Sequence, residues 1–306
     1  LTVDNLRSVD IVTAEGQLLH ASAEINSDLF WALRGGGGNF GVVTAFEYDL
    51  HPVGPTVLAG RILYPFDDAP AVLRHYRDFV TDAADEVNCL AGIASSPAAS
   101  TRPGLGAGRQ FVQLLAAYVG EPKDAEDALR PLRTFGEPMV DEIRFRPYTE
   151  LQRLLTETAD PGYRNYWKSD YLVGLPDDAI DIVVKHCDPF PSEWSSVFFE
   201  TMGGAINRNS HGATAFPHRN ATFSVTAWAR WKNSTADDDH REWARSFSTA
   251  MAPYSTDGVY VNFLSLEGDD RVDAAYGENH GRLAALKAEY DPTNLFQMNQ
   301  NIVPET

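Results

Sequence analysis

The chain contains 306 residues, with a hydrophobic content of 43% and a formal net charge of −18 at pH 7. This length is sufficient to bury a substantial core and accommodates one or two domains. The strong negative charge argues against binding to nucleic acids or anionic membranes, because a polyanion gains nothing by approaching phosphate groups. The sequence contains no apolar run long enough to cross a bilayer.

The first 55 residues predict two strands, a short helix and a third strand. The strands are expected at 9–12, 17–20 and 42–46, and the helix at 29–33. A glycine turn separates the first two strands, and Asn26-Ser27-Asp28 is typical of a helix N-cap. The region ends in His51-Pro52-Val53-Gly54-Pro55, which favours a domain boundary because prolines and glycines interrupt regular structure.

The glycine run Gly35–Gly38, followed by Asn39-Phe40-Gly41, admits two interpretations. A turn that requires positive φ would explain the glycines without any ligand. The run lacks the lysine and Ser/Thr of a phosphate-binding P-loop, and its spacing is not that of a dinucleotide fingerprint. By itself the run therefore favours a turn, and a cofactor role depends on the rest of the chain.

Residues 56–270 alternate between strand-like and helix-like segments. Strands are expected at 56–64, 87–93, 111–118, 143–145, 166–172, 197–201, 223–231 and 259–264. Helices are expected at 71–83, 125–135, 149–158, 177–187 and 239–251. The pattern predicts an α+β fold in which a large antiparallel sheet is covered by helices.

Cysteines and histidines provide no sign of a metal site. Cys89 and Cys187 lie far apart, without CxxC spacing, so neither a disulfide framework nor a zinc site is expected. Metal-ligand spacing is also absent from His211, His218, His240 and His280. We therefore expect no metal.

The tail combines a helix with an amide-rich end. Leu283, Leu286 and Tyr290 share one helical face, and Asp291-Pro292 ends the helix because proline cannot continue it. The cluster Asn299-Gln300-Asn301 then follows. Side-chain amides both donate and accept hydrogen bonds, as a flavin edge or a buried backbone would require.

This tail resembles the C-terminal signature of the berberine-bridge-enzyme-like FAD-linked oxidoreductases, which are VAO/PCMH-type flavoproteins. The glycine run before its FGVV strand also resembles this family, as do YWKSDY at 166–171, TAFPHR at 214–219 and YVNF at 260–263. The resemblance implies three parts: the C-terminal part of a PCMH-type FAD-binding domain at 1–55, a substrate-binding domain at 56–270, and a tail at 271–306 that returns to the FAD domain. It also implies a fragment lacking the first half of the FAD domain, because no Gly-Gly-His element occurs in the sequence.

The resemblance implies FAD as the cofactor. The cofactor-binding residues that it implies are Gly41, Val43, Asn262, Asn299 and Asn301. In this family a carbon–hydrogen bond is held against the flavin for hydride transfer, and a base removes a proton from the substrate.

The usual base of the family has no counterpart here. In several members it is a tyrosine at the last position of the YVNF segment, where this chain has Phe263. Strand 223–231 also lacks the carboxylate that some relatives use. The remaining catalytic candidates are Tyr260 and Tyr166, for which the alternative is a packed aromatic side chain.

Three further side chains are substrate-binding candidates. Lys168 shares a strand face with Tyr166, and its alternative is a solvated or ion-paired lysine. Trp228 and Trp231 could form a stacking surface for a sugar or an aromatic substrate, although core packing would explain at least one of them.

The hypothesis is an FAD-dependent oxidase or dehydrogenase that transfers a hydride from a hydroxyl- or amine-bearing small molecule to flavin. Molecular oxygen is the expected electron acceptor, and neither nucleic acid nor membrane is an expected partner. The alternative is a flavin-free small-molecule-binding module derived from such an enzyme. An NAD-linked dehydrogenase is disfavoured because no βαβ fingerprint is present.

Overall fold

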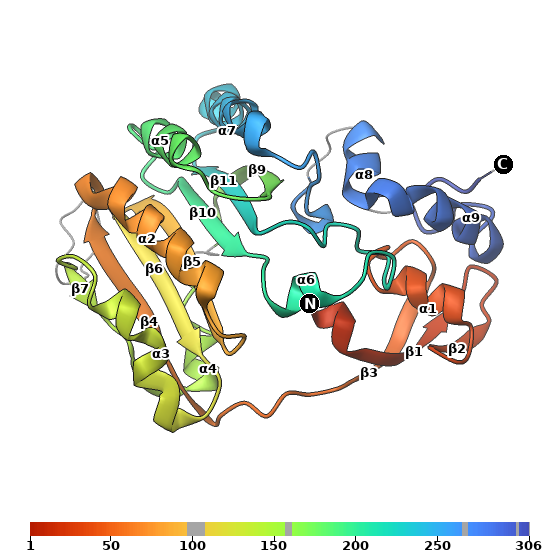
Figure 1. The fold of residues 1–306 in the computed structure, drawn as a ribbon. Helices are drawn as coiled ribbons and strands as arrows, with labels where there is room; N and C mark the ends of the chain where they lie inside the picture. Colours follow the sequence, from red (N-terminus) through yellow and green to blue (C-terminus); the bar gives the residue numbers. More distant parts are fainter. Residues whose placement is uncertain (97–107, 157–160, 265–268, 298–299, 306) are drawn as a thin grey trace. The chain divides into compact units, whose positions relative to one another are not determined.

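The computed structural model describes residues 1–96, 108–156, 161–264, 269–297 and 300–305 (Figure 1). The chain forms two compact units. The first comprises Leu1–His51, Ala205–Asn220 and Gly258–Thr306, and the second comprises Pro52–Gly204 and Ala221–Asp257. The expected division did not assign 205–220 to the first unit, and it placed the return of the chain at 271 instead of Gly258. Within the described ranges, no helix is both long and apolar enough to span a membrane.

The first unit contains a three-stranded antiparallel sheet in the order β2-β1-β3. Its strands are β1 Leu6–Val12, β2 Leu18–Ser22 and β3 Val42–Tyr48. Its helices are α1 Ser27–Leu33, α6 Ala205–Arg208, α8 Asp269–Tyr276 and α9 His280–Tyr290, with 3-10 turns η1 Thr2–Asn5, η7 Val261–Phe263 and η8 Gly277–Asn279. Leu29 of α1, Leu283 of α9 and Ile302 of the tail are fully buried in one core, because each presents an apolar face there.

The second unit contains an eight-stranded antiparallel sheet in the order β7-β4-β6-β5-β10-β11-β9, with β8 also paired to β4. Its strands are β4 Thr56–Pro65, β5 Val87–Ser95, β6 Gln110–Tyr118, β7 Val140–Asp141, β8 Arg144–Pro147, β9 Arg164–Leu172, β10 Ser196–Thr201 and β11 Phe223–Trp231. Its helices are α2 Ala69–Asp82, α3 Ala125–Arg133, α4 Tyr148–Leu151, α5 Asp177–His186 and α7 Asp237–Met251, with 3-10 turns η2 Phe66–Asp68, η3 Pro122–Asp124, η5 Ser234–Ala236 and η6 Ala252–Tyr254. The predicted α+β class is confirmed.

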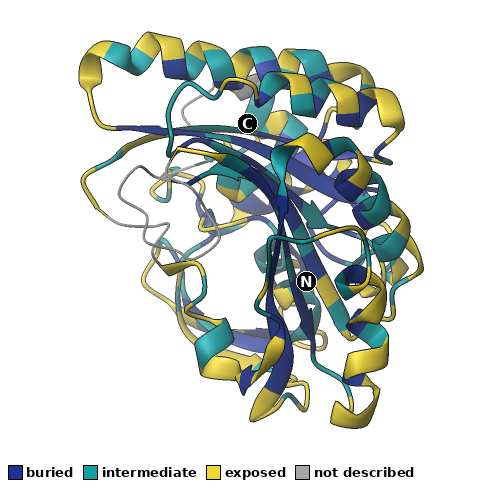
Figure 2. Cartoon of the chain, turned by 90° about the vertical axis from the view of Figure 1, so that its left-hand side faces the viewer, coloured by how far each residue is buried: buried dark blue, intermediate teal, exposed yellow. Residues whose placement is uncertain are grey.

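Helices α2, α3, α5 and α7 pack on one face of this sheet. Apolar residues of these helices, such as Tyr76 of α2 and Phe247 of α7, share a core with alternate residues of the strands, such as Val225 of β11. Figure 2 shows buried strands beside helices whose outer sides are exposed. Alternation therefore gives the sheet a helix-covered face and an opposite face, which we call the open face. The free thiols of Cys89 and Cys187 are buried in the same core.

Two predicted elements were wrong. The strand expected at 259–264 is the 3-10 turn η7, in which Phe263 N–H donates to the Tyr260 carbonyl and Leu264 N–H to the Val261 carbonyl. These local bonds replace the cross-strand bonds that a strand would require. The helix expected at 149–158 is confined to α4, and the next residues continue as turns with i to i+3 bonds; its last two residues lie outside the described ranges.

The start of α1 also differs in detail. Asn26 occupies the N-cap position with a left-handed φ of 47°, but its side chain makes no cap bond. Its Nδ2 donates instead to the His20 carbonyl over 2.8 Å. The side chain therefore secures the turn before the helix, and Ser27 begins the helix itself.

Candidate functional site

The glycine bend and the amide-rich tail meet at Asn39, which is 2% exposed. Its Oδ1 accepts a hydrogen bond from Ile302 N–H over 3.0 Å, and its Nδ2 donates to the carbonyls of Gly36 over 2.8 Å and Gln300 over 3.2 Å. Tyr276 also donates to the Gln300 carbonyl, and burial raises the pKa of this tyrosine to about 12. Two segments far apart in the sequence are thus joined inside the first unit.

A buried ion pair reinforces this junction from α9. Lys287 and Asp291 are both fully buried, and Lys287 Nζ donates to Asp291 Oδ2 over 2.5 Å, to the Asn39 carbonyl over 2.7 Å and to the Phe296 carbonyl over 2.8 Å. Asp291 also accepts from the backbone N–H groups of Leu295 and Phe296. Burial alone would raise the pKa of Asp291, but the hydrogen bonds from Lys287 and the backbone outweigh burial and lower it.

Close packing accounts for two of the glycines. A Cβ on Gly35, whose φ is +140°, would lie 2.4 Å from the backbone nitrogen of Phe216. A Cβ on Gly41, whose φ is +153°, would lie 2.5 Å from the Val12 carbonyl oxygen. Glycine is therefore required at both positions by the fold itself. The bend is followed directly by β3. Val43 of this strand, a predicted cofactor contact, is partly buried.

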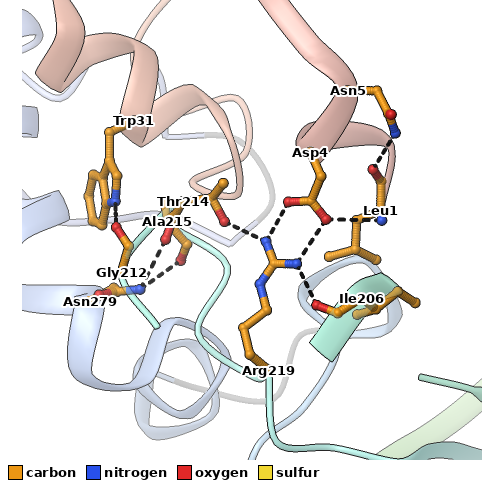
Figure 3. A network of polar contacts seen from close by, with 10 residues as sticks. All are labelled: Leu1, Asp4, Asn5, Trp31, Ile206, Gly212, Thr214, Ala215, Arg219 and Asn279. Carbon is orange, nitrogen blue, oxygen red and sulfur yellow. Dashed lines mark hydrogen bonds and ion pairs between the residues drawn. The ribbon is translucent and has the colours of Figure 1, made fainter. Parts of the chain in front are cut away.

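The TAFPHR segment is anchored in the first unit by Arg219, as Figure 3 shows. Its guanidinium makes a two-pronged ion pair with Asp4 over 2.6 and 2.8 Å and donates to Thr214 Oγ1 over 2.8 Å. Nearby, Trp31 Nε1 donates to the Gly212 carbonyl over 2.7 Å. Burial alone would raise the pKa of Asp4, but hydrogen bonds, first from Arg219, lower it. This segment is part of the framework of the first unit, a role that the sequence analysis did not assign.

The predicted residues Tyr260 and Asn262 are brought together by η7. Asn262 Nδ2 donates to the Tyr260 hydroxyl over 2.7 Å, and the Tyr260 ring meets the Phe263 ring edge-on at 5.0 Å. An amide nitrogen can only donate, so the phenol oxygen is the acceptor in this bond and its own proton is directed elsewhere.

Two asparagines of the tail, Asn299 and Asn301, are predicted cofactor-binding residues, and the structure describes only the second. Asn299 lies outside the described residues. The Oδ1 atom of Asn301 is buried and accepts no hydrogen bond from the part of the chain that the structure describes. A buried acceptor of this kind normally requires a donor. A polar ligand could supply that donor to Asn301 Oδ1.

In the second unit, Tyr166, Lys168 and Trp231 lie on the helix-covered face. The Tyr166 hydroxyl accepts from Arg245 Nε over 3.3 Å, and Trp231 Nε1 donates to Asp237 over 2.9 Å; both partners belong to α7. Lys168 pairs with Ala227 of the core and shares this face by alternation.

Trp228 lies on the open face. Its ring meets the Trp167 ring at 6.2 Å with an interplanar angle of 71°, and its Nε1 donates to Asn165 over 3.0 Å. The predicted substrate residues are therefore divided between the two faces of the sheet, and their roles stay predictions.

The sequence analysis missed a group of polar residues on the open face. Thr226 Oγ1 donates to Ser169 Oγ over 3.1 Å, and the hydroxyl oxygens of Ser169 and Ser224 lie 3.4 Å apart. Ser224 pairs with Glu200 in the register of β11 and β10, and burial raises the pKa of the Glu200 carboxyl while Ser224 offsets part of that rise. These residues come from β9, β10 and β11, and only the strand register brings them together. Among the described residues, no group of three or more His, Cys, Asp or Glu side chains could hold a metal ion.

Comparisons with known proteins agree with this architecture. The family model described as Berberine and berberine like matches residues 259–303. The chain is 30% identical to the (R)-6-hydroxynicotine oxidase of Paenarthrobacter nicotinovorans, over 100% of this chain and 67% of that protein. It is 28% identical to the xylooligosaccharide oxidase of Thermothelomyces thermophilus, over 99% of this chain and 64% of that protein.

A solved structure of 6-hydroxy-D-nicotine oxidase from Arthrobacter nicotinovorans is also similar, with a TM-score of 0.84 and 28% identity. The likeness covers 99% of this chain and 67% of that one. The chain thus spans about two thirds of the length of the curated relatives it matches.

Proposed function

The chain belongs to the berberine-bridge-enzyme-like family of FAD-linked oxidoreductases, and on that premise we propose that it acts in an FAD-dependent oxidase or dehydrogenase. The proposed reaction removes a hydride from a hydroxyl- or amine-bearing small molecule, with molecular oxygen as the final electron acceptor. The observation that carries the proposal is the junction at Asn39, because it joins the glycine bend and the tail that resemble the family's cofactor-binding segments.

The residues of the first unit fit a flavin in two respects. Asn301 offers a buried acceptor without a donor among the described residues, and a flavin carries ring N–H and ribityl O–H groups that could donate to it. Gly41 and Val43, which lie at the end of the glycine bend and in β3, are the proposed backbone contacts of the cofactor. Asn262 and Asn299 complete the proposed contacts. When bound, FAD would supply the hydride acceptor.

The protein's own side chains would then orient the substrate. Tyr260 is held by Asn262 with its hydroxyl proton directed away from that amide, so it can donate to a substrate oxygen. Trp228 and Trp167 place two indole rings on the open face, which suits stacking against a ring-shaped substrate. Tyr166, Lys168 and Trp231 would take part only if substrate reached the helix-covered face.

The test is a spectrum of the full-length protein, followed by anaerobic addition of hydroxylated and amine-bearing compounds. We expect a flavin absorbance band that bleaches with a substrate and returns when oxygen is admitted. The Tyr260→Phe variant, with Tyr254→Phe as the control, should slow bleaching while flavin content stays constant. A full-length protein that neither holds flavin nor gains thermal stability from added FAD would contradict the proposal and favour the flavin-free binding module.

A further inference from the structure

Helices α2 and α3 of the second unit, both labelled in Figure 1, border an apolar groove. The two helices are joined beside it by His75 of α2. The His75 ring stacks on the Phe135 ring with the centroids 4.1 Å apart, and its Nε2 lies 3.0 Å from the Pro131 carbonyl oxygen. The groove has a volume of about 330 Å³, which lies within the range of small-molecule sites.

The floor of the groove is apolar. Phe79 of α2, Val87 of β5 and Ala128 of α3 line it, and each is partly buried against the core of the second unit. Pro131 of α3 lines the same groove and is exposed. Covering apolar surface of this kind is favourable, because it removes that surface from water.

The rim of the groove is negatively charged. Asp78 and Asp82 lie one turn apart on α2, and both are exposed. Asp78 pairs with Arg77 over 2.8 Å, but this arginine also pairs with Asp177 of α5 over 2.7 Å. Asp82 forms no ion pair with the part of the chain that the structure describes. The described residues that line the groove include no Lys, Arg or His.

The end of α2 adds to this negative charge. Asp82 is the last residue of the helix, and the last turn contains no basic residue. The final carbonyl groups of a helix have no intrahelical partner and carry partial negative charge. The chain leaves the helix at Ala83 in an extended conformation, with φ −66° and ψ 145°. The groove therefore combines an apolar floor with two carboxylates and a helix C-terminus.

We propose that this groove, which we call the α2–α3 groove, binds a small organic cation that consists of an ammonium group on an apolar body. The ammonium group lies beside Asp78 and Asp82, and the apolar body covers Phe79, Val87 and Ala128. The face of the Phe79 ring adds a cation–π attraction. An inorganic cation fits less well, because Mg²⁺ and Ca²⁺ require several oxygen ligands and gain nothing from an apolar floor.

This inference does not depend on the proposed flavin chemistry. Helices α2 and α3 cover one face of the large sheet, whereas Trp167 and Trp228 lie on its open face. The sheet thus separates the α2–α3 groove from the proposed stacking rings of the same unit. The groove is a second small-molecule site, and a cation that binds only the folded protein also stabilises it.

The test is methyl NMR of the full-length protein with labelled alanine and valine side chains. Ala83, Ala84, Val87 and Ala128 line the groove and serve as reporters. The probes are benzyltrimethylammonium, benzyl alcohol and benzoate, which share a phenyl ring and differ in charge. We expect the cation to bind about tenfold more tightly than the alcohol, as two exposed charge contacts allow, and benzoate to leave the reporters unchanged. Sodium chloride should weaken binding of the cation only.

Variants separate the charge from the floor. Asp78→Asn and Asp82→Asn should each weaken binding of benzyltrimethylammonium about threefold and leave benzyl alcohol unaffected. Their matched control is Asp67→Asn, which removes an exposed carboxylate of η2 outside the groove. Ala128→Leu fills the groove and should abolish the shifts caused by both probes. Its control is Ala71→Leu at an exposed position of α2, and thermal unfolding verifies that each variant is folded.

Equal binding of the three probes would overturn the proposal, and so would shifts confined to methyl groups outside the groove. Calcium chloride that shifts the same reporters at equal ionic strength would identify a metal site instead. Reporters that move with protein concentration alone would identify a contact between copies of the chain. Either result also overturns the proposal. None of these measurements requires flavin or turnover, so their failure and the failure of the proposed function are distinguishable.

Discussion

At the scale of single residues, the buried pair Lys287–Asp291 is the sharpest test of the tail junction. Replacement of Asp291 by Asn leaves the Lys287 ammonium buried without a counter-charge. We expect a loss of about 3–5 kcal/mol in the free energy of unfolding, because breaking one side of a buried pair is costly. Denaturant titration measures it. The control is Asp49→Asn, which breaks the exposed pair with Arg7 and should cost about 0–1 kcal/mol.

The same carboxylate predicts a pH dependence of stability. The pKa of Asp291 is lower in the folded protein than its ordinary value. The stabilisation is therefore present above the unfolded-state pKa and is lost as the pH falls through the folded-state pKa. Asp291→Asn should flatten the stability profile in that acidic window, measured as the denaturant midpoint against pH. Equal acid sensitivity of the variant and the wild type would contradict this assignment.

The glycine bend allows a comparison between two nearby glycines, Gly35 with positive φ and close packing and Gly38 with neither. Gly35→Ala would place a Cβ against the backbone of Phe216 at positive φ, whereas a Cβ on Gly38 meets nothing within 4 Å. Strain of this kind costs about 1–3 kcal/mol. We expect Gly35→Ala to lower Tm by several degrees and Gly38→Ala to leave it nearly unchanged. Similar Tm values for the two variants would mean that the bend does not pack as described.

At the scale of elements, Asn39 joins the glycine bend to the tail. Asn39→Ala would leave the Ile302 N–H without its acceptor and the Gln300 carbonyl without its Asn39 donor. A buried group that loses its partner costs about 1–3 kcal/mol. Hydrogen exchange should therefore accelerate at Ile302 and leave the strands of the second unit unchanged. Slow exchange at Ile302 in the variant would place the attachment of the tail elsewhere.

Sequence periodicity predicted most elements because amphipathic faces leave a local pattern. The helix expected at 71–83 is α2, on which Val72 and Tyr76 are both fully buried. The strand expected at 259–264 failed because strand formation depends on a partner strand, which the pattern does not specify. The group of polar residues on the open face was missed for a related reason. Ser169, Ser224 and Glu200 are remote in sequence, and only register makes them neighbours.

At the scale of the whole molecule, the unusual property is charge. The chain carries 43 acidic and 25 basic side chains, a net charge of −18. Net charge of this size disfavours the compact state through self-repulsion. Specific ion pairs such as Arg219–Asp4 are buried and therefore resist screening, whereas repulsion between exposed carboxylates is screened readily.

This difference predicts that moderate salt stabilises the protein. Because the Debye length falls from about 10 Å at 0.1 M to about 3 Å at 1 M ionic strength, Tm should rise with sodium chloride and then level off. The control is an equal osmolality of a neutral solute, which leaves the repulsion in place. A Tm that falls with salt would contradict this prediction. It would mean that the attraction within exposed ion pairs such as Arg7–Asp49 is larger than the repulsion among the excess carboxylates, because salt screens both.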